Sequence, residues 1–95
     1  MKAIYLKHTK KPSKYGGFFY YIFCKGEDGK SYRTCIGDNF RNFFKWKNIL
    51  HHAESGDELL NLQTKLFKGK KIIDADSSPT LKKIEHNETD IFSTR

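Results

Sequence analysis

The spacing of apolar residues changes along the chain, so that β-rich stretches lie on either side of a helix. Phe18–Cys24 is a run of aromatic and β-branched residues without a breaking residue, which is typical of a strand. Asp28-Gly29 favours a two-residue hairpin turn, and Ser31–Ile36 is the expected return strand. From position 40 to position 51 or 52 the apolar residues recur with helical spacing, which predicts a helix of about three turns.

The predicted helix follows two residues that can cap its start. Asp38 or Asn39 can accept an amide hydrogen bond at the N-terminus of the helix. Trp46 is expected to anchor the helix in the core, although its neighbours Lys45 and Lys47 also suit a contact with a polyanion.

The segments that flank this central unit carry weaker signals. Met1–Leu6 predicts a short strand, and the lysine-rich stretch after it predicts a mobile basic loop or arm up to Gly17, because Pro12 lacks an amide hydrogen. Polar and apolar residues alternate in Glu58–Phe67, which favours a half-buried strand, although its leucines also fit a helical period.

A further hairpin is expected near the C-terminus. Lys68-Gly69-Lys70 is typical of a turn, and Lys71–Asp76 predicts the strand after it. Leu81 and Ile84 predict one more strand or turn. The pattern as a whole predicts a mainly β fold with one helix, and a small α+β unit is the alternative.

The two-residue turn sets an expected register for the hairpin. It pairs Phe23 with Thr34 and Tyr21 with Ile36, which places Arg33 on the other face together with Tyr20. Both faces are then largely apolar. Either both are covered, as in a small closed barrel, or one exposes rings to a ligand.

Length and composition limit the class of protein. The 95 residues suffice for a single domain, expected over residues 1–84, with a polar, mildly acidic tail over residues 85–95. No apolar run is long enough to span a bilayer, and Cys24 and Cys35 are too few for a disulfide scaffold. A cytoplasmic protein with reduced thiols is therefore expected.

The net charge of +7 is concentrated at the start of the chain, where residues 1–25 hold six lysines and no acidic residue. Lysines beside aromatic rings predict a partner that combines phosphates with stackable bases, which is single-stranded nucleic acid. Arg33 ranks first among the candidate contacts because a guanidinium both stacks and binds phosphate. The full set is Lys7, Lys10, Lys11, Lys14, Tyr15, Tyr20, Tyr32, Arg33, Arg41 and Lys45.

Enzymatic and metal chemistry find little support. The histidines and cysteines lack zinc-ligand spacing, and the sequence holds no phosphate-binding loop or nucleophile motif. Asp74 and Asp76 share a strand face, but two carboxylates alone are a thin basis for a nuclease. We expect no enzyme activity, no cofactor and no metal.

Two motifs resemble parts of a known family. Gly56–Leu60 and Lys68–Asp76 are similar to the Gly-Asp pair before a central strand and the Lys-Gly-Lys hairpin of OB-fold proteins. The resemblance implies a five-stranded barrel and the activity of phage- or plasmid-type single-stranded DNA-binding proteins, which favours DNA over RNA and no strong sequence preference. The acidic and apolar residues Glu85–Phe92 are similar to the partner-binding tail of bacterial members, but the terminal Phe is absent.

A second class of function stays open at this stage. A hairpin that is apolar on both faces also suits a small protein-interaction or inhibitor module of a mobile element, and it leaves room for a homodimer.

Overall fold

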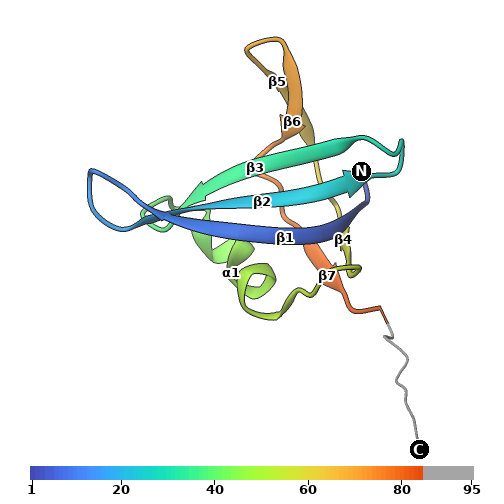
Figure 1. Ribbon diagram of the computed structural model, residues 1–95, viewed down its shortest axis with the longest axis horizontal. Helices are drawn as coiled ribbons and strands as arrows, with labels where there is room; N and C mark the ends of the chain where they lie inside the picture. The colour runs from blue at the N-terminus through green and yellow to red at the C-terminus, as the bar shows by residue number, and fades with distance from the viewer. Residues whose placement is uncertain (85–95) are drawn as a thin grey trace, which may run out of the picture.

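The computed structural model describes residues 1–84, which form a mainly β fold with one helix (Figure 1). The elements are β1 (Ala3–Pro12), β2 (Phe18–Gly26), β3 (Ser31–Gly37), α1 (Phe43–His52), β4 (Glu58–Leu60), β5 (Thr64–Phe67), β6 (Lys70–Ile73) and β7 (Thr80–Lys82). Strands β3, β2, β1, β4 and β7 form an antiparallel sheet in that order, and β5 and β6 form a separate hairpin.

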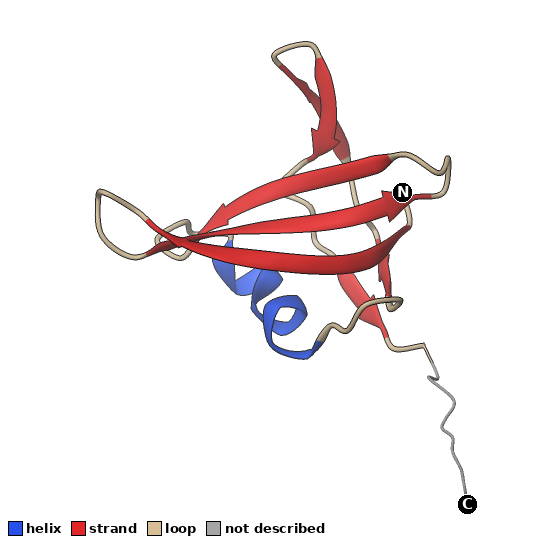
Figure 2. Ribbon diagram, in the orientation of Figure 1, coloured by secondary structure: helices blue, strands red, loops and turns tan. Residues whose placement is uncertain are grey.

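The ladder of strands is open over the part of the chain that the structure describes. β6 lies alongside β3, but its hydrogen-bonded partner is β5, so no closed barrel is found in residues 1–84. The helix α1 packs against one face of the sheet (Figure 2). Among the same residues, no helix has the length and apolar character needed to cross a membrane.

Strand β1 is longer than the sequence predicts, and the prediction of a basic loop was wrong for residues 7–12, which belong to the strand. β1 pairs with β2 as far as Pro12, which lies opposite Phe18, and the irregular pairing between Tyr5 and Lys7 is a bulge. The lysines of this stretch continue the ladder because aromatic residues of β2 lie across from them. Pro12 is tolerated because it is the last residue of the strand.

The β2–β3 hairpin has a different register from the predicted one. Its loop has three residues, 27–29, rather than two: the Gly26 amide donates to the Lys30 carbonyl at 2.8 Å, and Gly29 has φ of 80°. As a result Phe23 pairs with Arg33, not with Thr34. A shift of one residue turns every side chain of β3 to the other face of the sheet.

Asp28 stabilises this loop. Its carboxylate accepts hydrogen bonds from the Lys30 amide at 3.0 Å and from the Tyr32 hydroxyl at 2.5 Å. The bond from Tyr32 is the main reason that the pKa of Asp28 is lowered and that of Tyr32 raised. Because its hydroxyl finds this partner at the end of the sheet, the Tyr32 ring can be buried in the core.

The helix begins three residues later than the spacing predicts, and the expected cap was wrong. Asn42 occupies the N-cap position without a side-chain cap bond. Its Nδ2 instead donates to the carbonyl of Ala75 at 2.7 Å, and the Trp46 ring nitrogen donates to the same oxygen at 2.9 Å. Trp46 is fully buried, which confirms its expected role as the anchor of the helix.

The segment Glu58–Phe67 is extended, not helical, but it is broken into two strands. Asn61 has φ of 63°, a left-handed conformation that ends β4 before β5 begins. The predicted Lys68-Gly69 turn is confirmed between β5 and β6. The last predicted element, a strand or turn at Leu81 and Ile84, is the strand β7, which includes Leu81 and ends before Ile84. The acidic tail 85–95 lies outside the described residues.

The core lies between the sheet, α1 and the chain around β6. Its buried apolar side chains are Ala3, Tyr5, Ile22, Cys24, Tyr32, Ile36, Trp46, Ile49, Leu59, Leu62 and Ile73. A buried carboxylate, Asp57, lies at its border and accepts hydrogen bonds from the amides of Glu54 and Ile84 and from Lys83 Nζ at 2.6 Å. Asp57 thereby ties the segment before β4 to the chain after β7.

The Asp57–Lys83 pair predicts a loss of stability in alkali. The hydrogen bond to Asp57 raises the pKa of Lys83 in the folded protein above 10.5. The contribution of the pair to the free energy of unfolding is therefore complete below pH 10.5 and is lost as the pH rises through the pKa of Lys83 in the folded protein. We expect Lys83→Met to lower the free energy of unfolding at neutral pH, and the difference from wild type to shrink above about pH 10.5. Urea titrations across this range measure it. Lys82→Met is the control, because Lys82 forms only a surface ion pair with Glu58 at 3.9 Å. If the free energy of unfolding depended on pH in the same way in both variants, the stabilising pair between Asp57 and Lys83 would be contradicted.

Candidate nucleic-acid interface

The face of β1, β2 and β3 that points away from α1 collects rings and cations. Tyr20 packs against Phe43 of the helix with ring centroids 5.8 Å apart, so its neighbours along β2 point to the opposite face. That face is called the outer face below. Given the registers of the three strands, it carries Lys7, Thr9, Lys11, Phe19, Tyr21, Phe23, Arg33 and Cys35.

The cations of the outer face lie close to its rings. Lys7 Nζ is 5.5 Å from the centroid of the Phe23 ring. Lys11 Nζ and Arg33 Cζ lie 5.8 and 5.7 Å from the centroid of the Tyr21 ring. These distances are within the range of cation–π attraction, and they place positive charge beside flat apolar surface on one side of the sheet.

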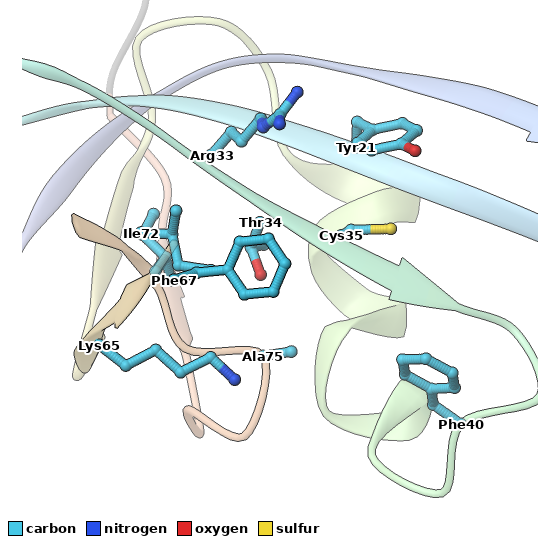
Figure 3. A pocket seen from close by; sticks show the side chains of 10 residues that line it. Tyr21, Arg33, Thr34, Cys35, Phe40, Lys65, Phe67, Ile72 and Ala75 are labelled. Carbon is cyan, nitrogen blue, oxygen red and sulfur yellow. The ribbon is translucent and has the colours of Figure 1, made fainter. Parts of the chain in front are cut away.

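A cleft of about 360 Å³ separates the outer face from the β5–β6 hairpin (Figure 3). Tyr21 and Arg33 line it from the sheet, and Phe67 and Lys65 line it from the hairpin, so each wall offers one ring and one cation. Ile72 of β6 adds an apolar side chain on the hairpin side. The Phe67 side chain is 52% exposed, which leaves a ring available to a partner.

The hairpin is positioned by polar contacts at its base. The amide of Asp74, just after β6, donates to the Gln63 carbonyl at 2.7 Å, and the buried Ser77 hydroxyl donates to the Asp74 carbonyl at 2.7 Å. Lys65 Nζ lies 3.8 Å from an Asp74 carboxylate oxygen and is half-exposed. These bonds hold both strands at their base, while the tip projects from the body (Figure 1).

The basic surface continues past the cleft. A neighbouring hollow of about 310 Å³ is lined by Phe23 and Arg33 on the sheet side and by Lys70 and Lys71 of β6. Arg33 borders both hollows and is exposed, so it lies at the centre of a groove that runs between β3 and the hairpin. The groove, as the term is used below, comprises both hollows and the outer face.

The two thiols differ in their surroundings. Cys24 is fully buried in the core, and burial raises its pKa to about 12. Cys35 borders the cleft; burial raises the pKa of its thiol, while Tyr21 and Arg33 act in the opposite direction.

The structure brings together part of the predicted set of contacts. Lys7, Lys11 and Arg33 share the outer face, and Arg33 does so because of the corrected register. Lys10 and Tyr20 lie on the opposite face of the sheet, contrary to a single continuous surface.

The remaining predicted contacts lie elsewhere. Tyr32 is buried at 6% exposure, so it is not available for stacking. Lys14 and Tyr15 are in the loop between β1 and β2, and Arg41 is exposed just before the helix. Lys45 Nζ donates to the Asp76 carbonyl at 3.4 Å, and Lys45 lines neither hollow of the groove.

The predicted contacts omit several groove residues, among them the rings and cations Tyr21, Phe23, Lys65, Phe67, Lys70 and Lys71. Tyr21 and Phe23 alternate along β2, and a three-residue turn would have placed them beside Arg33. The pattern of β5 gives no comparable signal, because the placement of the hairpin opposite β3 depends on long-range contacts.

No family model, curated protein or solved structure matches the chain. Within residues 1–84, no group of three or more His, Cys, Asp or Glu side chains is arranged to hold a metal ion.

The thiols offer a direct check of the groove's geometry. We expect an alkylating reagent to modify Cys35 first in the folded protein, and Cys24 to react at least about tenfold more slowly, because Cys24 is buried and poor in thiolate. Mass spectrometry of timed reactions measures both rates, and Cys35→Ser provides the control for Cys24 alone. Equal rates at the two thiols under native conditions would contradict the described packing.

Proposed function

We propose that this protein binds single-stranded DNA in the groove between the outer face and the β5–β6 hairpin, without strong sequence preference. The observation that carries the proposal is that both sides of the cleft hold a ring and a cation: Tyr21 with Arg33 beside its ring on the sheet, and Phe67 and Lys65 on the hairpin.

The arrangement suits unpaired bases. Every base has a π-face that stacks on an aromatic ring, and the phosphates that follow each base need nearby cations. In a duplex the base faces are already stacked on one another, so the rings of the groove would have no partner. The exposed Lys7 and Lys11 are placed beside the rings, where a backbone that connects stacked bases would pass.

The composition of the cleft supports tolerance of sequence. Reading a base requires fixed donors and acceptors at its edge. Apart from the two cations, the polar side-chain groups that line the cleft are the Tyr21 hydroxyl, Thr34 and the Cys35 thiol, while Phe40, Phe67 and Ile72 are apolar. Stacking and charge would therefore dominate the affinity.

The fold is also compatible with an OB-like barrel that is open between β3 and β6. The order of three strands, a helix, and then further strands follows that plan, with β1 paired to both β2 and β4. In this interpretation the cleft lies at the opening, because β3 and β6 supply its opposite walls. We infer a binding module rather than an enzyme.

A protein-interaction module is the second candidate. Leu66 is 75% exposed near the tip of the β5–β6 hairpin, and Phe44 is 71% exposed on α1, which are large apolar surfaces for a free chain. Light scattering separates the two candidates: a tight dimer without affinity for oligonucleotides favours the interaction module.

Removal of the central ring should weaken binding. We expect Tyr21→Ala to lower the affinity for oligothymidylate by about 5- to 150-fold, which corresponds to about 1–3 kcal/mol for one lost stacking contact. Fluorescence anisotropy at low salt measures it. Phe44→Ala, which removes an exposed ring from the helix, is the matched control and should bind like wild type. Unchanged affinity in Tyr21→Ala, with thermal unfolding showing a folded variant, would contradict the proposed stacking.

Salt dependence tests the phosphate contacts separately. The logarithm of the affinity should fall with the logarithm of salt concentration by about 0.7 per phosphate contacted. Arg33→Gln should reduce this slope by about 0.7, whereas Arg33→Lys should keep the slope and still lose affinity, because lysine lacks the stacking plane. A slope that is the same in Arg33→Gln as in wild type would place Arg33 outside the phosphate path.

A further inference from the structure

The β1–β2 hairpin carries a cation and rings on its second face as well. Because side chains alternate along β1, Lys10 points away from the outer face that holds Lys7 and Lys11. Its Nζ lies 4.1 Å from the centroid of the Phe18 ring and 6.0 Å from that of Tyr20. These three residues, Lys10, Phe18 and Tyr20, are called the inner arm patch below.

The inner arm patch is rigid on one side and open on the other. Tyr20 packs between His8 and Phe43, with centroid distances of 6.3 and 5.8 Å, so its ring is fixed against the helix. Phe18 is 39% exposed, and this part of the hairpin extends beyond α1 (Figure 1). Tyr20 therefore forms the fixed side of the patch, and the neighbouring Phe18 ring is the exposed one that a base can reach.

The charge around the patch is positive. Residues 1–26 contain no acidic residue, and Lys14 lies in the adjoining loop with its Nζ 5.3 Å from the ring of Tyr15, which is 80% exposed. Asp38 is the acidic side chain that packs under this loop, against Gly17. The surface complements a polyanion rather than a neutral peptide or a second basic copy of this chain.

A free strand edge joins the two faces. β4 pairs with β1 at Ala3 and Ile4, and the last bond on that side runs from the Gly56 amide to the Tyr5 carbonyl at 2.9 Å. Within the described residues, no strand covers β1 on that side from Lys7 to Pro12. A chain of phosphates can therefore cross this edge, where backbone amides and lysines are available as donors.

We propose that a single strand bound in the groove turns around this free edge of β1 and continues over the inner arm patch, with a base on Phe18 and a phosphate at Lys10. The inference rests on the proposed function and extends it: the protein would hold one strand on both faces of the β1–β2 hairpin. A short oligonucleotide would fill the groove alone, and a longer one would also reach the patch.

The test compares two lengths of oligothymidylate: about six nucleotides, near the lower end of the roughly 4–16 nucleotides that one small single-strand-binding domain covers, and about twenty, which exceeds that range. Phe18→Leu keeps an apolar side chain and removes the ring, and Lys10→Gln removes the charge. We expect Phe18→Leu to lower the affinity for the long oligonucleotide by about fivefold or more, and the affinity for the short one by less than about twofold. Lys10→Gln should also act on the long oligonucleotide alone.

The controls separate this inference from the proposed function. Lys2→Gln removes an exposed lysine just before β1, away from the loop end of the hairpin, and should leave both affinities unchanged. Tyr21→Ala should lower the affinity for both lengths. If it does so while Phe18→Leu and Lys10→Gln change neither affinity, the proposed contact at the inner arm patch is overturned, and the proposed binding in the groove is retained. If Lys10→Gln lowers the affinity for both lengths equally, the proposal that only a longer strand reaches the inner arm patch is also overturned. If wild type binds neither length at tens of micromolar, the proposed function fails together with the inference.

Discussion

The register of the β2–β3 hairpin is the constraint on which the rest of the structure depends. The three-residue loop, with Gly29 in a left-handed conformation and Asp28 bonded to Tyr32, pairs Phe23 with Arg33. In this register Tyr32 and Ile36 turn into the core, where burial of each large apolar side chain contributes about 1.5–3 kcal/mol. A slip of one residue would lose both contributions and would move Arg33 away from the rings.

The β5–β6 hairpin forms the wall of the groove opposite the sheet, and the helix and the segment after β6 hold that hairpin in position. The Ala75 carbonyl accepts hydrogen bonds from both Asn42 and Trp46, so the start of α1 is fixed to the chain that leaves the hairpin. This single acceptor links the buried anchor of the helix to the position of β6. The cleft therefore lies between two elements that are each tied to the same core, and Phe67 faces the sheet across a defined gap.

Much of the order of strands and helix follows from the sequence, but the assignment of side chains to one or the other face of the sheet does not. The aromatic run of β2, the helical spacing before Trp46 and the Lys68-Gly69 turn are local signals, and each predicts its element. The register requires a choice between two- and three-residue turns at Asp28-Gly29, and the sequence is compatible with both.

The long-range features of the groove are the ones that local signals miss. Asn42 resembles an ordinary helix cap until its partner at Ala75 is known, and β1 extends through a lysine-rich stretch because β2 lies beside it. The same tertiary pairing buries Tyr32, one of the predicted stacking rings, and brings Tyr21 and Phe23 to the surface beside Arg33. Residue type and charge therefore indicate that rings and cations lie near one another in the fold, but they do not determine which of these side chains share a face.

The most direct measurement is chemical-shift mapping by nuclear magnetic resonance during titration with a short single-stranded oligonucleotide. The proposed groove requires the largest changes at Tyr21, Phe23, Arg33 and Phe67, with little change at Phe44 on the exposed side of the helix. Shifts confined to the helix, or no shifts at tens of micromolar protein in low salt, would contradict the assignment of this surface to single-stranded nucleic acid.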